Sequence, residues 1–323
     1  MPYSRRGALG AAGAALLWAG AGARASTWPQ RPVRLLVPFA PGGSSDIAAR
    51  MVSVRLQDVL QQTVIVDYRA GANGNLGADQ VSRSAGDGHT FLVTDIVGLA
   101  ISPAVYPSMS FDPLKDLQTV GMLSYSPHVL ATHPSVQATS LAELAALSQR
   151  TPLNMATSSI GSSAHLSALQ IQLESGARWQ YVPYKGGAPA INDTVANQTQ
   201  VLVNGFTATL PMVGTGRLKA IALTHSRRMP GFAGIPTAAE SGIPGYVSGT
   251  YQGVMAPAAM PAEHVARMAA ALRSVLQAGE VQQAAAAQAA EVLVQTPQQM
   301  DAFYRAEAQR WGDIARKNKV SAV

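Results

Sequence analysis

The chain has 323 residues, of which 47% are hydrophobic and 13% charged. This composition can bury the cores of two ordinary domains and excludes a wholly disordered protein. The absence of cysteine excludes disulfides, zinc-thiolate sites, a cysteine nucleophile and a lipoprotein cysteine. Half of the net charge of +6 comes from Arg5, Arg6 and Arg24, and no basic run follows them, so we expect no nucleic-acid partner.

Residues 1–25 are typical of a cleavable secretory signal peptide. An apolar run follows the Arg5-Arg6 pair, and the small-x-small sequence at 23–25 predicts cleavage after Ala25. The run is broken by glycines and is shorter than the ~20 residues that a membrane span needs. We therefore expect a periplasmic protein without a lipid anchor. The arginine pair is compatible with general or twin-arginine export.

Strand-like and helix-like patterns alternate after residue 30. The apolar run 33–39 predicts a strand covered on both faces, and apolar residues from 48 to 59 recur at helical spacing. Strands at 63–68 and 89–95 flank a second helix, which opens in the sequence GANGNLGADQVSRSA. This βαβαβ order predicts an α/β fold with mostly parallel sheets and helices on both faces.

A second α/β set begins at Ser140, which forms a capping-box pattern with Glu143. Strand, turn and helix patterns follow through residue 224, and the Pro/Gly-rich segment 229–246 predicts a loop. Residues 251–257 predict a strand that returns to the first domain. The alanine-rich segment 281–290 predicts a helix, and a capping pattern beginning at Thr296 predicts another.

Two loops, at 38–46 and 156–165, place small and hydroxyl-bearing residues between a strand and a helix. Ligands of open α/β sheets bind at the carboxyl ends of strands, and helix N-termini attract anions. Gly42 and Gly43 would let backbone amides face such a ligand without obstruction. One loop per domain predicts an anion site in a cleft between the domains. An ordinary capped turn is the alternative for either loop alone.

The sequence gives weaker support to phosphate-binding, dinucleotide-binding, hydrolase and metal sites. No Gly-Lys-Ser/Thr follows the first glycines, and glycines 71, 74 and 77 lack the spacing of a dinucleotide site. No G-x-S-x-G elbow supports a secreted serine hydrolase that would use Ser44 or Ser162. No H-E-x-x-H pattern suggests a metal. We expect neither catalytic residues nor a metal or cofactor.

Three ionisable residues lie near the predicted cleft. Asp46 falls in the first turn of a helix, where an acid favours the dipole. His165 lies three residues after Ser162, and we expect it to pack or hydrogen-bond locally. Asp95 ends the strand 89–95, so its charge would favour a ligand with an ammonium group if it faces the cleft; a loop cap is the alternative.

Six segments resemble, in order, the signatures of the Bug-type solute receptors, which are the extracytoplasmic binding proteins of tripartite tricarboxylate transporters. The resemblance covers nearly all of the mature chain. The segments are WPQRPVRLLVPFAPGGSSDIAAR, AGANGNLGADQVSRSAGDGHTFLV, SSIGSSAHL, VPYKGGAPAINDTVANQTQV, GRLKAIALT with IPTAAESGIPGY, and FYRAEAQRWGDI.

The resemblance implies a two-domain Venus-flytrap binding protein without catalytic activity. Residues 26–126 and 249–323 would form the first domain, and residues 127–248 the second. The chain would cross near 124–131 and return near 246–256, so the two crossings would form a hinge that closes over the ligand.

The resemblance also implies that the two loops hold a ligand carboxylate through backbone amides, hydroxyls and water, while further residues line a variable side. The chain departs from the family at Asp95-Ile96, where small or hydroxyl residues are common, and at Asn204, near which an acid is common. The implied ligand residues are Phe39, Ala40, Pro41, Gly42, Gly43, Ser44 and Asp46 in the first loop, Ser158, Gly161, Ser162, Ser163 and His165 in the second, and Thr94, Asp95 and Asn204 on the variable side.

The ligand class therefore stays open among dicarboxylates, tricarboxylates, amino acids and aromatic acids. The expected partners are the membrane permease subunits of a tripartite tricarboxylate transporter, and we expect a monomeric receptor. A ligand-sensing subunit with the same binding site is the alternative function.

Overall fold

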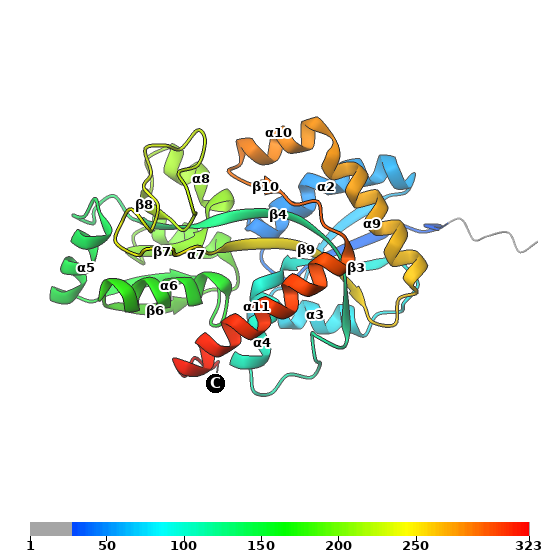
Figure 1. Ribbon diagram of the computed structural model, residues 1–323, viewed down its shortest axis with the longest axis horizontal. Coiled ribbons are helices and arrows are strands. Elements are labelled where there is room, and N and C mark those ends of the chain that lie inside the picture. Colours follow the sequence, from blue (N-terminus) through cyan, green and yellow to red (C-terminus); the bar gives the residue numbers. More distant parts are fainter. Residues whose placement is uncertain (1–27, 323) are drawn as a thin grey trace, which may run out of the picture.

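The computed structural model describes residues 28–322, so the predicted signal peptide lies outside the described residues. The chain forms two lobes joined by two long strands (Figure 1). Each lobe is a sheet with helices on both faces, which confirms the predicted α/β class. Between residues 28 and 322, no helix combines the length and apolarity that a membrane span requires.

The first lobe contains the predicted βαβαβ order, with β1 in the middle of a parallel β2-β1-β3 arrangement. β1 is apolar throughout because it is covered on both faces. Val33, Leu35 and Val37 pack under α2, whereas Leu36 packs on the opposite face under α3 and α4. The elements are β1 Val33–Val37, α2 Ser44–Leu60, β2 Val64–Tyr68, η1 Ala72–Gly74, α3 Asn75–Ser82, β3 Thr90–Asp95 and α4 Ile96–Val105.

The second lobe repeats the arrangement around the parallel strands β7-β5-β6. Helices α5 and α6 cover one face of this sheet, and α7 and α8 cover the other. The elements are α5 Leu141–Arg150, β5 Leu153–Thr157, α6 Ser163–Ser175, β6 Trp179–Pro183, α7 Gly187–Val195, β7 Val201–Gly205, α8 Phe206–Gly214 and β8 Lys219–Leu223.

Two antiparallel strands, β4 Leu117–Thr132 and β9 Gly249–Pro257, join the lobes in the order β3-β9-β4-β7. The predicted parallel pairing therefore describes the outer parts of each sheet, while the pairs made by β4 and β9 are antiparallel. Leu123 of β4 belongs to a core of the first lobe and Leu130 to a core of the second. Near the predicted domain boundaries, which stay a prediction, Pro127 pairs with Gly249.

After β9 the chain returns to the first lobe through α9 Ala262–Gln277, α10 Gly279–Ala287, β10 Glu291–Val292 and α11 Pro297–Lys317. The side chain of Thr296 accepts from the N–H of Gln299, and the Gln299 side chain accepts from the N–H of Thr296, so the predicted capping box is confirmed. Helix α10 confirms that the alanine-rich segment is helical. Helix α11 packs against α4 on the face of the sheet opposite α2 and α9 (Figure 1).

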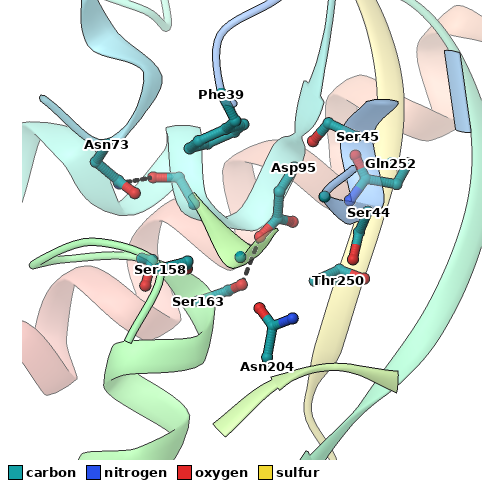
Figure 2. Close-up of a pocket in the computed structure, with 14 residues that line it drawn as sticks. Phe39, Ser44, Ser45, Asn73, Asp95, Ser158, Ser163, Asn204, Thr250 and Gln252 are labelled. Carbon is teal, nitrogen blue, oxygen red and sulfur yellow. Dashed lines mark hydrogen bonds between the residues drawn. The ribbon is translucent and has the colours of Figure 1, made fainter. Parts of the chain in front are cut away.

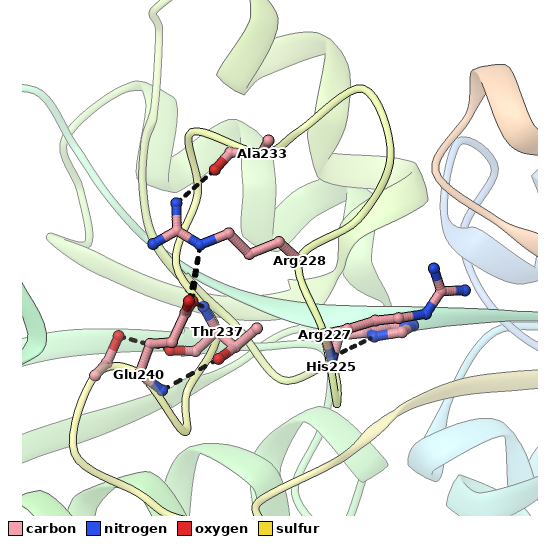
Figure 3. Close-up of polar contacts among 7 residues, drawn as sticks. His225, Arg227, Arg228, Ala233, Thr237 and Glu240 are labelled. Carbon is pink, nitrogen blue, oxygen red and sulfur yellow. Dashed lines mark hydrogen bonds and ion pairs between the residues drawn. The ribbon is translucent and has the colours of Figure 1, made fainter.

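The predicted loop at 229–246 is confirmed, and one carboxylate connects several of its turns (Figure 3). Glu240 accepts from the Nε of Arg228, at 2.9 and 3.0 Å, and from the N–H of Thr237, at 2.8 Å. The N–H of Thr237 and the guanidinium of Arg228 lower the pKa of Glu240. Arg228 also donates to the carbonyl of Ala233 at 2.6 Å, so the segment is held locally despite its glycines and prolines.

Candidate functional site

The N-terminus of α2 is open to a ligand. The N-cap is Gly43, which has no side chain to bond the first helical N–H groups. Gly42, at φ +85°, turns the chain into the helix in a conformation that favours glycine. Because Gly43 and the hydroxyls of Ser44 and Ser45 line a cavity, the positive end of α2 is directed at that cavity.

Asp46 holds this loop from behind. It accepts from the N–H of Gly42 at 2.8 Å, from the Nε of Arg50 at 2.8 Å and from the hydroxyl of Tyr68 at 2.7 Å. The side chain is buried and does not line the cavity. Asp46 therefore supports the backbone of the loop 38–46 and does not face the cavity.

The N-terminus of α6 is built differently, because its own side chains occupy several donors. Ser162 is the N-cap and accepts from the N–H of His165 at 3.1 Å. The N–H of Gly161 donates to Nδ1 of the same histidine at 3.1 Å. Burial lowers the pKa of His165 to about 4, so the ring is neutral and can accept this hydrogen bond. His165 thus hydrogen-bonds locally, as its position in the sequence suggested.

A cavity of about 40 Å³ lies between the N-termini of α2 and α6, which we call the two helix mouths, and is lined by residues from both lobes (Figure 2). Eight of the residues implied by the family resemblance line it: Phe39, Gly43, Ser44, Asp95, Ser158, Ser162, Ser163 and Asn204. The structure thus brings together both loops, the end of β3 and the end of β7.

The other implied residues lie near the cavity without lining it. Gly42 and Gly161 set the backbone of their loops, at φ +85° and +74°. Thr94 is buried in β3, and the N–H of Ala40 donates to the carbonyl of Lys185 in the second lobe at 3.3 Å. Asp46 and His165 support their loops as described, and Pro41 lies between Ala40 and Gly42 in the first loop.

Ser45, which lies within the first predicted loop, also lines the cavity. Sequence reasoning missed five lining residues: Asn73, Gly98, Gly187, Thr250 and Gln252. Gly187 begins α7 in the sequence YKGGAP, whose glycine pair before a helix repeats the signal of the first loop. Thr250 and Gln252 are two residues apart on β9, so both side chains face the same side of the sheet. Their role depended on the register of β9, which local patterns do not specify.

Several contacts across the cavity hold the lobes together. The hydroxyl of Ser163 donates to the carboxylate of Asp95, and Nδ2 of Asn73 donates to the carbonyl of Gly161 at 3.1 Å. Asn73 also donates to the carbonyl of Gly98 at 3.1 Å, and its backbone is left-handed, at φ 56°. The described conformation is therefore a closed one.

Asp95 both caps a helix and faces the cavity, which combines the two alternatives given for it. Its carboxylate accepts from the N–H of Val97 at 3.3 Å, at the start of α4, and from the N–H of Tyr251 at 3.1 Å. Burial raises the pKa of Asp95 to about 6, against the opposing effect of these donors and of Ser163.

A serine, a histidine and an aspartate meet here, but not as a catalytic triad. Ser163 lies between Asp95 and Nε2 of His128, at 3.3 Å, while Nδ1 of His128 faces Ser248 Oγ at 3.1 Å. A triad requires the histidine between serine and acid. His128 is fully buried, which lowers its pKa to about 3. Among the described residues, no group of His and carboxylate side chains could hold a metal.

The chain has two lobes that enclose a polar cavity and are connected by two strands. This architecture defines a solute-binding protein of the periplasmic type, and comparison with known proteins agrees. The chain matches the tripartite tricarboxylate transporter family receptor over residues 48–320. It is 36% identical to protein BugT of Bordetella pertussis over 296 residues, which cover 91% of each chain. The chain therefore belongs to this receptor family and is not an enzyme.

Solved structures support the same assignment. Rpa4515 of R. palustris, solved with adipate, has a TM-score of 0.88 at 30% identity and covers 91% of this chain and 100% of its own. The periplasmic binding protein BugD has a TM-score of 0.87 at 28% identity, with coverage of 91% and 100%. MatC of Rhodopseudomonas palustris, with bound malate, has a TM-score of 0.85 at 29% identity, with coverage of 89% and 99%.

Proposed function

We propose that this protein captures a small carboxylate in the periplasm and delivers it to the permease subunits of a tripartite tricarboxylate transporter. The observation that carries the proposal is the uncapped N-terminus of α2, which opens into the cavity between the lobes. The relatives solved with adipate and malate bind ligands of this chemistry.

The chemistry of the cavity suits a carboxylate. The N–H groups of the first turn of α2 have no capping side chain, and the hydroxyls of Ser44 and Ser45 lie beside them. Ser158 adds a hydroxyl from the second lobe. Hydrogen bonds from such donors to a charged oxygen contribute ~1.5–3 kcal/mol each, so three of them at the upper end of this range would match the ~8 kcal/mol of micromolar binding.

Ligand entry requires the lobes to separate. A cavity of about 40 Å³ has room for roughly three water molecules, which is less than a dicarboxylate occupies. We propose that β4 and β9 act as the hinge, since in the described part of the chain they are the strands through which the backbone passes from one lobe to the other. Closure would then bring Ser163 to Asp95 and Asn73 to Gly161.

The experiment is thermal unfolding of the mature chain, refolded from denaturant to remove any ligand acquired in the cell. A carboxylate at one hundred times its Kd should add ~2.7 kcal/mol to the free energy of unfolding. Dicarboxylates, tricarboxylates, amino acids and aromatic acids would be tested. A chain that folds but responds to none of them would overturn the proposal. Loss of uptake in cells lacking the protein would separate transport from sensing.

A further inference from the structure

The carboxylate of Asp95 lines the cavity without a cation. Its side chain is 8% exposed, and its partners are Ser163 and two backbone N–H groups. Within residues 28–322, no lining residue of this cavity is Lys, Arg or His, and Asp95 forms no ion pair. A purely anionic ligand enclosed here would meet a like charge in a site sheltered from water.

Gln252 lies next to Asp95 and also lacks a partner. The two residues are paired in register on β9 and β3, which places their side chains on the same face of the sheet. Gln252 is 3% exposed and lines the cavity, yet neither its Nε2 nor its Oε1 has a hydrogen-bond partner in the described structure. Buried amides are nearly always satisfied, so this pair of atoms points to a missing ligand group.

The partners of Asp95 indicate which group that is. The N–H groups of Val97 and Tyr251 can only donate, so they stabilise the ionised carboxylate. A ligand group that meets this carboxylate must bring donors, and a positive charge would also neutralise it. An ammonium group supplies both, with one N–H for Asp95 and another for Oε1 of Gln252.

Resting on the proposed carboxylate function, we propose that Asp95 and Gln252 form an ammonium subsite and that the ligand of this receptor is a small amino carboxylate. Its carboxylate would bind at the first turn of α2, where Ser44 and Ser45 lie. Its ammonium group would reach the strand pair β3 and β9. Figure 2 shows Asp95, Gln252 and Ser44 around the same cavity.

The test compares ligands that differ only by an amino group: L-aspartate with succinate, L-glutamate with glutarate, and L-phenylalanine with 3-phenylpropanoate. Calorimetric titration of the refolded mature protein should show, for at least one pair, tighter binding of the amino member by about 30-fold or more. In Asp95→Asn that preference should disappear, because the amide keeps an acceptor for Val97 and Tyr251 but lacks the charge.

Two further variants complete the design. Gln252→Leu removes the amide from the same face and should cost the amino member about 10-fold while sparing its partner without the amino group. It carries the test even if Asp95→Asn does not fold. Asp58→Asn removes a charge from an exposed acid on α2 and should leave both members unchanged.

The outcomes separate the two proposals. If members without the amino group bind as tightly as the amino members, or if either Gln252→Leu or a folded Asp95→Asn keeps the wild-type preference, the ammonium subsite is wrong while the carboxylate function stands. If no carboxylate with or without an amino group binds the folded wild type, the carboxylate function itself fails.

Discussion

The two helix mouths look alike in sequence and differ in structure. Both follow a strand with small residues and hydroxyls, but the N-cap is Gly43 at α2 and Ser162 at α6. At α6 the serine and His165 occupy two donors. At α2 no side chain caps the helix, and Asp46 holds the loop from outside the cavity. The comparison teaches that similar sequences can leave the N–H groups of one helix N-terminus uncapped, at α2, and occupy those of another with its own side chains, at α6.

The largest expected effect comes from converting the open mouth into a capped one. Gly43→Asp would place a carboxylate where it can bond the first N–H groups of α2, in competition with the ligand. We expect carboxylate affinity to fall by more than ~100-fold in titration calorimetry, since several charge-assisted hydrogen bonds are lost.

Its control is Gly43→Ala. The backbone there has φ −84°, and an added Cβ would come no closer than 3.6 Å to the carbonyl of Ala40, so the fold should be kept. Undiminished affinity in a folded Gly43→Asp would mean that the carboxylate does not bind at α2.

At the N-terminus of α6, we expect the backbone conformation of Gly161 to be the most sensitive feature. Gly161 has φ +74°, and a Cβ there would lie 2.7 Å from Cγ1 of Val105. Val105 belongs to the first lobe and Gly161 to the second, so separation of the lobes would relieve this clash. We therefore expect Gly161→Ala to lower the free energy of unfolding by only ~1 kcal/mol in urea titrations, through its positive φ, and to lower carboxylate affinity by ~30-fold, because the closed state is overpacked.

Gly176→Ala is the matched control, with φ +70° and no atom closer than 4.0 Å to the added Cβ. It should cost ~1 kcal/mol of stability and leave carboxylate affinity unchanged. Wild-type carboxylate affinity in a folded Gly161→Ala would show that the contact with Val105 is unimportant.

Acid should lower the free energy of unfolding because His165, in the first turn of α6, must gain a proton. The pKa of this histidine is lowered to about 4 from 6.5, so between these values the unfolded chain binds a proton that the folded chain does not. Stability due to the neutral ring is complete above pH 6.5 and is lost as the pH falls toward 4, by ~2 kcal/mol at pH 5. His128 changes stability in the same direction.

Asp95 has the opposite effect on stability from the two histidines. Because its pKa is raised, the folded state binds a proton that the unfolded state does not, so this residue adds stability as the pH falls over a similar range. In urea titrations between pH 7 and pH 5, His165→Asn should therefore show a loss that is smaller than that of the wild type by ~2 kcal/mol. Parallel losses in the two proteins would contradict a neutral buried His165.

The smallest effect tests the cap itself. Ser162→Ala removes the acceptor of the His165 N–H and should lower the free energy of unfolding by ~1 kcal/mol. Carboxylate affinity should change less than in Gly43→Asp, because the open mouth is intact. A larger loss of affinity in Ser162→Ala than in Gly43→Asp would reverse the assignment of the two mouths.

Features set by residues close together in the sequence were predicted, and features set by contacts between distant segments were not. Both loops were predictable because the strand, the small residues and the helix follow one another within ten residues. Their difference was not, because glycine and serine are both common at N-caps. The helix α4 was missed, although Asp95 caps it, because its apolar sequence and Pro103 carry no amphipathic pattern.

Long-range register decided the rest. Gln252 reaches the cavity only because β9 returns beside β3, and Asn73 only because a left-handed turn directs it toward Gly161. The sixteen residues of β4 were expected only as a crossing, since Pro127 and the serines around it interrupt any strand pattern. Four cores, two in each lobe, receive residues of this strand, and their packing outweighs its local preferences.

The pairing of β4 with β9 also limits how the receptor can move. A flexible tether would let each half tumble independently, whereas a hydrogen-bonded ribbon transmits torque and resists shear. Its irregular points, between Thr119 and Gly121 and between Met122 and Ser124, lie on the side of the first lobe. We expect the paired strands to bend at these points. The lobes would then open by rotation about a single axis, and each closure would bring the same two faces of the lobes together again.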